Sequence, residues 1–461
     1  MKKFNVFLYC FLIVVLACSK DPKPDPCETD PQPGCPNYVD PCEIDPQPGC
    51  PNYVDPCEIN PQPGCPNYVD PDIPVLNNTI TIGSVSYTVD STYTKKIEDG
   101  FWYVFAQIKN TSKPLIIHSL RYETGNSGYS IETWVGKDSV TGKETPQAMV
   151  ARYEQAGREV RAVINGGFYG VAEGGTPMSL EVMNGVMTFP PSSDEPQPII
   201  GFDTKNRPYM DYVELNASVT DKDNRKFNIT SVNTTRWADF FVLYNSFMGS
   251  RTKTNEWGTE VLCTPTMAQW EKLSSHIDVR CRIDAVESQS GKGSMVIDKG
   301  KIVLSGHGTG NAYLSTLKQG DNIDVTVDFF LKSEPKINST VIRNVVSGYN
   351  IILQGNSIIE PNPEQIPDMP LVLDSHPRSS VGFSADSSYV YFTVVEGRRP
   401  GLAAGVSTKE LAQVMKYLGA ANAINLDGGG SSCLMIDKET KNYCTDGAQR
   451  AVINGLAIIK K

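Results

Sequence analysis

Three consecutive glycines near the C-terminal end place the strongest local constraint on how this sequence can fold. They lie in residues 425–432, Asn-Leu-Asp-Gly-Gly-Gly-Ser-Ser, directly after an apolar run. Glycine has no side chain to pack and is costly in backbone entropy, so runs of it occur where the chain needs positive φ or a close approach. We predict a turn whose Asp427 carboxylate, hydroxyls and N–H groups bind and act on a phosphate or sugar. The alternative is a tight turn capped by Asp and Ser, with no further function.

The N-terminus has the pattern of a secretory signal. Two lysines precede an almost entirely apolar run over residues 4–16, which is too short to span a membrane as a mature helix. The following Ala-Cys makes residues 15–18 similar to a bacterial lipobox, so residues 1–18 are interpreted as a signal peptide with Cys18 as the lipidated residue. Acyl chains on Cys18 would anchor the chain. We expect an exported bacterial lipoprotein of the outer membrane, facing the periplasm or the cell surface. Ordinary cleavage that leaves Cys18 as a thiol is the alternative.

Three near-identical units of 15 residues follow, each reading DPCE-x-(D/N)-PQPGCPNYV, within residues 25–69. Proline is so dense in them that neither a helix nor a sheet ladder can run through. We interpret residues 19–72 as a stiff spacer of small disulfide-closed loops. A ligand-binding repeat array is the alternative, although each unit offers few apolar residues, namely Tyr, Val and, in the second and third units, Ile.

The cysteine count agrees with export. With Cys10 and Cys18 set aside, ten of the twelve cysteines remain, and an even remainder in an exported chain favours disulfides. Local pairing is the simplest arrangement. It predicts the pairs 27–35, 42–50, 57–65, 263–281 and 433–444. A zinc site is disfavoured because the chain has no CxxC and only four histidines. No cofactor is predicted, and a cation near Asp427 is left open.

The net charge of −10 argues against nucleic acid as a partner, because no basic run is present to neutralise phosphates in bulk. A few well-placed arginines can still bind a single phosphate. The composition leaves the oligomeric state open.

From about residue 73 the composition becomes that of a globular protein, and period-two alternation predicts strands over residues 80–89 and 102–108. Helical spacing is less common. We predict helices over residues 145–160, 264–275 and 407–418, the last with a capping box and a glycine stop.

Many strands with few helices between them indicate an α+β fold. We expect a β-rich N-terminal portion over residues 73–140 and a larger mixed domain over residues 141–461. Strand-like segments within residues 212–350 indicate an inserted subdomain.

Five glycine-marked segments share one pattern, an apolar strand that runs into a polar turn. They cover residues 162–170, 374–383, 394–402, 425–432 and 450–456. This ordered set resembles the phosphodiester glycosidase family, which includes the animal "uncovering" enzyme that removes N-acetylglucosamine from phosphodiester-linked mannose. The resemblance covers about residues 145–461. Glu396 departs from the pattern, because Asp is more usual there, and its additional methylene changes the reach of the carboxylate.

The resemblance implies cleavage of a sugar phosphodiester, and the residues suit that chemistry. Arg378 and Arg398 each offer a bidentate fork for the phosphate, and backbone N–H groups of residues 428–431 can add an anion nest. Carboxylates are needed for proton transfer or attack at the anomeric carbon, with Asp427 as the first candidate and Glu173 and Glu396 as its possible partners. The other candidate substrate- or phosphate-binding residues are Asn165, Gly166, His376, Gly428, Gly429, Ser431, Ser432 and Arg450.

The leading hypothesis is therefore a membrane-anchored hydrolase that releases the sugar of a sugar-1-phosphodiester and leaves a phosphomonoester. Two alternatives stay open. One is a phosphodiesterase that attacks phosphorus, although such enzymes commonly use paired metals and no His/Asp cluster is evident. The other is a non-catalytic glycan-binding lipoprotein.

Overall fold

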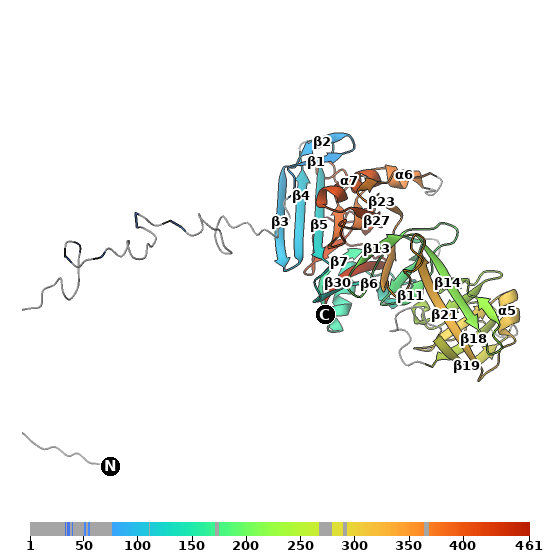
Figure 1. The fold of residues 1–461 in the computed structure, drawn as a ribbon. Coiled ribbons are helices and arrows are strands. Elements are labelled where there is room, and N and C mark those ends of the chain that lie inside the picture. The colour runs from blue at the N-terminus through green and yellow to red at the C-terminus, as the bar shows by residue number, and fades with distance from the viewer. Residues whose placement is uncertain are drawn as a thin grey trace, which may run out of the picture. The chain divides into compact units, whose positions relative to one another are not determined.

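The computed structural model describes residues 76–109, 111–170, 175–266, 279–288, 293–363 and 368–461, with isolated positions between 33 and 55. The chain divides into two compact units, Met1–Asp72 and Ile73–Lys461 (Figure 1). The signal, Cys18 and most of the spacer lie outside the described residues. Cys35 and Cys50 are disulfide-bonded, but the partners predicted for them, Cys27 and Cys42, are not described, so that pairing stays a prediction.

The second unit is β-rich with a few helices, which confirms the predicted α+β class. Sheet I has eight strands in the order β24-β23-β27-β25-β26-β5-β4-β3. Its strands are β3 Ser91–Glu98, β4 Phe101–Ile108, β5 Leu115–Glu123, β23 Asn350–Gln354, β24 Ser357–Ile358, β25 Arg378–Phe383, β26 Tyr389–Val395 and β27 Asn422–Asn425.

Two five-stranded sheets accompany sheet I. Sheet II has the order β29-β28-β7-β30-β6, and sheet III has the order β11-β10-β22-β12-β13. The strands of sheet II are β6 Tyr129–Val135, β7 Glu159–Asn165, β28 Leu434–Ile436, β29 Glu439–Thr440 and β30 Asn454–Lys460. Those of sheet III are β10 Glu181–Met183, β11 Val186–Phe189, β12 Ile199–Phe202, β13 Pro208–Asp211 and β22 Asn344–Ser347.

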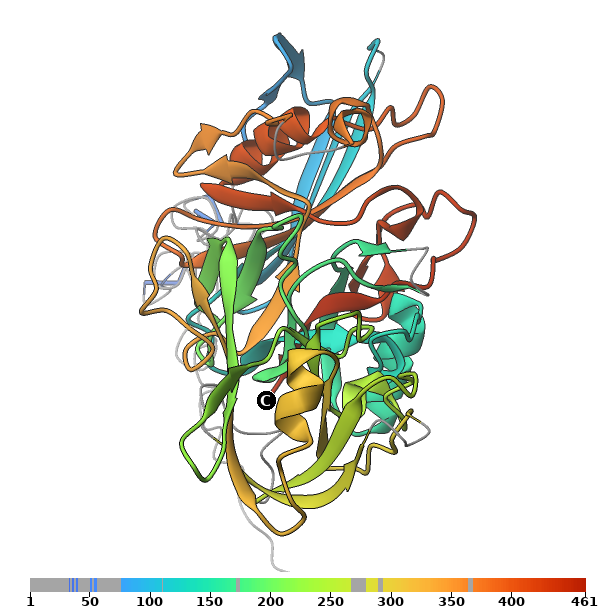
Figure 2. The ribbon, with the colours of Figure 1, turned by 90° about the vertical axis from the view of Figure 1, so that its right-hand side faces the viewer.

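Sheet IV is built from the segment that the sequence marks as an insertion. Its order is β15-β14-β21-β19-β18-β20-β17-β16, and only β16 and β17 pair in parallel. Its strands are β14 Val213–Thr220, β15 Lys226–Asn228, β16 Ser231–Val232, β17 Phe241–Tyr244, β18 Thr259–Pro265, β19 Val279–Glu287, β20 Ile302–Gly306 and β21 Asn322–Leu331. Figure 2 shows helix α5 Thr309–Leu314 lying over this sheet, where Tyr313 and Leu314 join its apolar core.

Two short hairpins complete the strands, β1 Thr79–Ile82 with β2 Val85–Thr88, and β8 Tyr169–Gly170 with β9 Thr176–Pro177. The single strand predicted over residues 80–89 is therefore two strands, because Gly83 (φ 63°) turns the chain back on itself.

The helices agree with the sequence in two of three cases. Helix α7 Thr408–Leu418 has the predicted capping box and ends at Gly419 in the left-handed region. Helix α4 Pro146–Gln155 starts after a Thr145 cap as predicted, but the predicted end at residue 160 is wrong, because Gly157 (φ 80°) follows the helix and Glu159 begins β7. The start of the third predicted helix is wrong, because Thr264 and Pro265 belong to β18; residues 267–278 are outside the described part. Helix α6 Met369–Leu373 was not predicted.

The apolar core of sheets I, II and III is continuous, since one cluster of buried residues joins Ile424 of sheet I, Leu456 of sheet II and Val346 of sheet III. A second cluster lies on the other face of sheet I, beneath α7. Residues 73–140 contribute strands to sheets I and II, because β5 pairs with β26 in sheet I and β6 pairs with β30 in sheet II.

Candidate functional site

The ends of several strands in sheets I and II bring the glycine-marked segments together. The Asp427 N–H donates to the Gly166 carbonyl at 3.1 Å, and the Gly166 N–H donates to the Asn454 carbonyl at 2.9 Å. The Gly429 N–H donates to the Pro377 carbonyl at 2.9 Å. Segments that are far apart in the sequence therefore form one polar surface where their strands end.

Two of the glycines are required by this packing. A Cβ atom on Gly166 would lie 2.1 Å from the Asn454 side-chain oxygen, which is far inside van der Waals contact. Gly429 has φ 61°, and the Arg398 guanidinium lies directly against it. The glycines thus allow close approach and positive φ, as the sequence predicts.

Asn165 is fully buried and holds the turn that carries Asp427. Its amide nitrogen donates to the Asp427 carbonyl at 2.7 Å. Its side-chain oxygen accepts from the Ser379 hydroxyl at 2.7 Å and from the Cys433 N–H at 3.1 Å. These bonds occupy the amide group, so Asn165 holds the site in position. It does not bind a sugar hydroxyl, which was the role that the sequence predicted.

Asp427 has the electrostatics of a reactive carboxyl group. Burial raises its pKa to about 6, even though the Ser431 hydroxyl, the Arg450 charge and the Gly428 N–H act in the opposite direction. The residue retains some exposed surface. Its carboxyl group therefore gains and loses a proton near pH 6, close to neutral pH.

Tyr169 and Ser431 flank this carboxyl group. Burial and the Asp427 charge raise the Tyr169 pKa. The Ser431 hydroxyl lies near both Asp427 and Tyr169, yet it makes no hydrogen bond of good geometry to any described residue. Tyr169 directly follows the Asn-Gly-Gly-Phe segment, which is the sequence signal for its place here.

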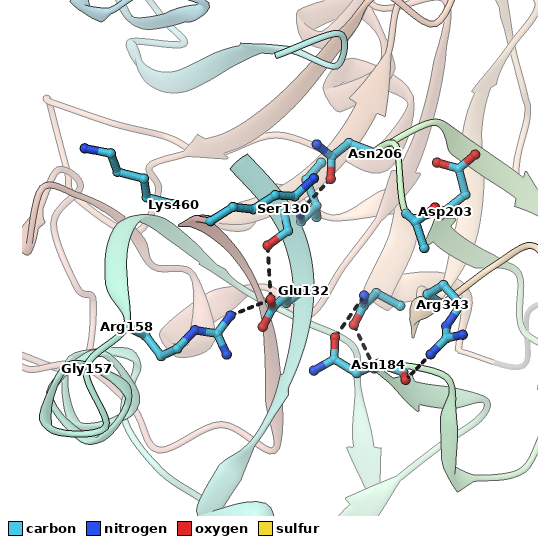
Figure 3. A pocket seen from close by; sticks show the side chains of 13 residues that line it. Ser130, Glu132, Gly157, Arg158, Asn184, Asp203, Asn206, Arg343 and Lys460 are labelled. Carbon is cyan, nitrogen blue, oxygen red and sulfur yellow. Dashed lines mark hydrogen bonds and ion pairs between the residues drawn. The ribbon is translucent and has the colours of Figure 1, made fainter. Parts of the chain in front are cut away.

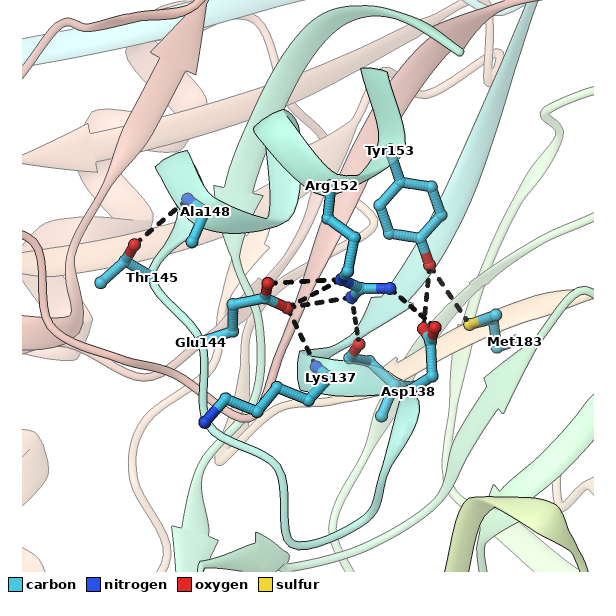
Figure 4. A network of polar contacts seen from close by, with 9 residues as sticks. Lys137, Asp138, Glu144, Thr145, Ala148, Arg152, Tyr153 and Met183 are labelled. Carbon is cyan, nitrogen blue, oxygen red and sulfur yellow. Dashed lines mark hydrogen bonds and ion pairs between the residues drawn. The ribbon is translucent and has the colours of Figure 1, made fainter. Parts of the chain in front are cut away.

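Lys143 adds a cation beside Tyr169. Its ammonium nitrogen lies 5.2 Å from the centroid of the tyrosine ring. The loop that carries Lys143 is fixed by α4, because Arg152 donates to Asp138 at 2.7 Å and to Glu144 at 2.9 Å (Figure 4). Lys143 lies outside the glycine-marked segments, so no sequence pattern pointed to it.

Arg398 is exposed and belongs to the site. Its φ of 57° is unusual for a residue with a side chain. The guanidinium donates to the His376 Nδ1 atom at 3.4 Å. Burial, together with the charges of Arg378 and Arg398, lowers the His376 pKa, which agrees with a neutral imidazole accepting this bond.

Arg450 is half-buried beside the glycine turn. It forms an ion pair with Asp446 at 2.7 Å, and both side chains lie directly against Gly430. The charge of Arg450 also acts on Asp427. Asp446 is a carboxylate of this surface that the sequence analysis missed, although its spacing of four residues from Arg450 was a usable signal.

Arg378 does not serve as the predicted phosphate clamp. Only 1% of its surface is exposed, and it donates to the carbonyls of Val406 at 3.0 Å, Leu371 at 2.6 Å and Asp374 at 2.9 Å. Burial, followed by the neighbouring Arg398 charge, lowers its pKa to about 10. Arg378 therefore holds α6 and the adjacent loop in place.

Glu396 is likewise occupied by the protein. Its carboxylate accepts from His118 Nε2 at 3.0 Å, from the Tyr443 N–H at 2.8 Å and from Arg399 at 2.5 Å. Burial raises its pKa, but these donors outweigh burial and lower it overall. We therefore assign Glu396 to a buried ion pair. Glu173, the other candidate partner of Asp427, lies outside the described residues.

The predicted anion nest is mostly used within the turn. The N–H groups of Gly429, Ser431 and Ser432 donate to protein carbonyls, while the Gly428 N–H faces the Asp427 carboxyl group. The Ser432 hydroxyl is buried and has no partner among the described residues. Asn454 holds the Gly166-Gly167 turn in place, since its side-chain oxygen accepts from the Gly167 N–H at 2.8 Å.

The predicted cysteine pairs of this unit are not formed in the structure, where Cys263, Cys281, Cys433 and Cys444 are free. Cys263 pairs across the sheet with Ile283, whereas Cys281 pairs with Pro265, so the two cysteines are diagonal rather than direct cross-strand neighbours. Cys433 and Cys444 are in contact as thiols.

Within the described part of the chain, no group of three or more His, Cys, Asp or Glu side chains is arranged to hold a metal ion. Nor does any helix of that part have the length and apolar character needed to cross a membrane.

Residues 277–459 match the family model described as phosphodiester glycosidase, which confirms the predicted resemblance. The match covers less than half of the chain and includes four of the five glycine-marked segments. An SPbeta prophage-derived uncharacterized protein of Bacillus subtilis (strain 168), YomE, is 35% identical over 83 residues. That stretch is 18% of this chain and spans only 13% of the relative's length.

Two solved structures share the fold, and a third is less similar. A protein from Synechocystis has a TM-score of 0.62 at 14% identity, covering 80% of this chain and 64% of that one. A protein from Burkholderia pseudomallei K96243 has a TM-score of 0.57 at 18% identity, covering 76% and 74%. The catalytic domain of zebrafish N-acetylglucosamine-1-phosphodiester alpha-N-acetylglucosaminidase has a TM-score of 0.40 at 12% identity, covering 82% and 90%.

Proposed function

Because residues 277–459 match the phosphodiester glycosidase family, we propose that this chain hydrolyses a sugar-1-phosphodiester to free sugar and a phosphomonoester. An N-acetylglucosamine α-phosphodiester is the substrate we propose to test first. The observation that carries this assignment is the Asp427 carboxyl group, whose pKa is raised by burial and which lies where the glycine-marked segments meet, with the Arg450 charge acting on it.

The two ends of the site suit the two halves of such a substrate. Asp427 is mostly ionised above pH 6 and can stabilise or attack the positive charge that develops at the anomeric carbon. Arg398, Arg450 and Lys143 supply positive charge for the departing phosphate. A sugar phosphate leaves readily, so charge stabilisation on its side matters more than proton donation.

The arrangement favours cleavage of the bond between carbon and oxygen over attack at phosphorus. The Asp427 carboxyl group beside the Arg398 and Arg450 cations suits a glycosidase, in which a carboxylate faces the sugar ring. For the cellular setting, we propose that Cys18 is lipidated and that residues 19–72 hold the catalytic unit away from the membrane.

The decisive experiment is product analysis with N-acetylglucosamine-α-phosphate-mannose and, in parallel, a p-nitrophenyl glycoside that lacks phosphate. We expect free sugar from the diester alone. In labelled water the label should appear in the sugar, whereas label in the phosphate would assign the chain to the phosphodiesterases.

Asp427→Asn is the matched variant, since it keeps the shape of the side chain and removes the charge. We expect an unchanged melting temperature and a loss of turnover of at least about a hundredfold. Glycan binding without turnover of any sugar-1-phosphodiester would instead support a binding lipoprotein.

A further inference from the structure

A second pocket lies at the opposite end of sheet II from the glycine turns. It has a volume of about 640 Å³ and is lined by the start of β6, the turn before β7, the end of β30 and turns of sheet III. The glycine turns follow the last residue of β7, whereas Arg158 of the pocket precedes its first residue. Seven strand residues separate the two sites by roughly 20 Å.

Asparagine side chains build the wall of this pocket along the free edge of β6. The Ile131 N–H donates to the Asn206 side-chain oxygen at 2.8 Å, and the Thr133 N–H donates to that of Asn344 at 2.9 Å. Both asparagines are buried, with 2% and 5% of their surface exposed. The backbone N–H groups of Ile131 and Thr133 at this strand edge are therefore hydrogen-bonded by side chains, which hold the pocket wall in place.

The lining is cationic in a chain whose net charge is −10. Arg158, Arg343, Lys460 and Lys461 line it together with only two carboxylates, Glu132 and Asp203. One oxygen of Asp203 already accepts from two backbone N–H groups of its own turn, at 2.8 Å and 2.9 Å. Arg158 pairs with Glu132 at 2.6 Å and Lys460 pairs with Glu159 at 3.5 Å, so Arg343 and Lys461 are the lining cations that remain for a ligand.

Arg343 lacks a carboxylate partner among the described residues. Its guanidinium lies flat against Gly185 and donates to the Asn184 carbonyl at 2.6 Å, while its Nε–H is buried without a partner. Burial lowers the pKa of Arg343, with no compensating acid. A half-buried, unpaired guanidinium is costly, and an anionic ligand would relieve that cost.

Glu132, in the same pocket, has a carboxylate oxygen that lacks a hydrogen-bond donor among the described residues. One of its oxygens accepts from Arg158 at 2.6 Å and from the Ser130 hydroxyl at 3.0 Å, but its other oxygen is buried with no donor among the described residues. That free oxygen requires a hydrogen-bond donor such as a hydroxyl group.

We propose that this pocket binds a small polyhydroxylated anion of the sugar phosphate class. Figure 3 shows Arg158 and Lys460 on one side, Arg343 on the other, and Glu132 between them. The sugar hydroxyls donate to the free Glu132 oxygen, and the phosphate pairs with Arg343. The site is separate from Asp427 and does not depend on the proposed hydrolysis.

Titration calorimetry on the full chain with glucose 6-phosphate tests the proposal, alongside glucose and inorganic phosphate as separate probes. We expect glucose 6-phosphate to bind at least tenfold more tightly than either part alone. Arg343→Ala and Glu132→Gln should each weaken binding by at least about tenfold, whereas Asp427→Asn should leave it unchanged.

Lys226→Ala is the control for charge, because Lys226 is exposed on β15 of sheet IV. Arg343→Gln, a second variant that keeps a polar side chain, separates loss of charge from loss of folding, which thermal unfolding also monitors. Equal affinity for inorganic phosphate, no binding, or binding lost in Asp427→Asn and kept in Arg343→Ala would each overturn the proposal.

Discussion

At the scale of single residues, burial acts on three carboxyl groups with different outcomes. For Asp427 and Glu181, burial raises the pKa by more than the hydrogen-bond donors lower it, so the pKa values rise to about 6 and about 7. Glu396 has His118, Arg399 and a backbone N–H as donors, and its pKa falls. The number and charge of the donors therefore separate a titratable carboxyl group from a permanent ion.

Glu181 provides a test of this contrast through stability. Its carboxyl group is fully buried and accepts from Thr188 at 2.6 Å and from Asn454. Between pH 4.5 and pH 7 the folded chain holds a proton that the unfolded chain has released, so the free energy of unfolding falls as pH rises through this window. Glu181→Gln should remove that fall and be more stable than the parent at pH 8, by up to about 3 kcal/mol.

Denaturant unfolding across pH 4–8 measures this effect, with Glu214→Gln, an exposed glutamate of sheet IV, as the control. Parallel pH profiles for Glu181→Gln and the parent would show that the buried carboxyl group does not titrate in this range.

The two arginines of the predicted phosphate clamp make a matched pair. Arg398→Ala removes an exposed guanidinium, so we expect KM for the phosphodiester to rise by about tenfold or more with little change in the melting temperature. Arg378→Ala removes a buried side chain that donates to three carbonyls, so we expect a loss of about 2–4 kcal/mol in the free energy of unfolding. Steady-state kinetics and thermal unfolding separate the two, and the reverse pattern would restore Arg378 to the phosphate site.

At the scale of secondary-structure elements, Asn165 joins the ends of three segments. It lies at the end of β7, and its hydrogen bonds reach Asp427 after β27, Ser379 in β25 and Cys433 before β28. One amide side chain thus sets how sheets I and II meet beside the reactive carboxyl group.

Asn165→Ala should therefore lower kcat more than it changes KM, because the Asp427 turn loses its support while the cations proposed to bind phosphate stay in place. Leaving three buried groups unpaired should also cost about 2–4 kcal/mol of stability. Kinetics at a temperature where the variant is folded test this. A rise in KM at constant kcat would indicate that Asn165 contacts the substrate.

At the scale of the whole molecule, the described core of the second unit draws only on residues from Ile80 onward. Sheet IV has its own apolar cluster, whereas sheets I, II and III share one. Figure 1 shows β3 and β4 at one end of this unit and the strands of sheet IV at the other. The polar site forms where sheets I and II meet and is made by this unit.

Removal of residues 1–72 should therefore leave the second unit folded. We expect the 73–461 unit to have the melting temperature of the full chain within about 2 °C and the same kcat/KM on a diester in solution. Calorimetry and product analysis check this. A loss of turnover beyond tenfold would show that the repeats contribute to the site.

The sequence by itself determined the features that depend on local backbone chemistry. The capping box of α7, the Thr145 start of α4 and the glycine turns each follow from neighbouring residues. The ordered glycine-marked segments also indicated the family, because close approach at several turns requires glycine at defined positions. Where a single apolar run could form one strand or a hairpin, as over residues 80–89, local pattern was insufficient.

Only the tertiary structure decided which polar side chains face solvent and which serve the fold. Arg378 and Arg398 occur in similar sequence patterns. Arg378 is buried and donates to three carbonyls, whereas Arg398 is exposed. The same holds for Glu396 and Asp427, and for Lys143, whose place beside Tyr169 depends on segments far apart in the sequence. Hydrogen-bond partners and burial come from segments far apart along the chain, so no local pattern encodes them.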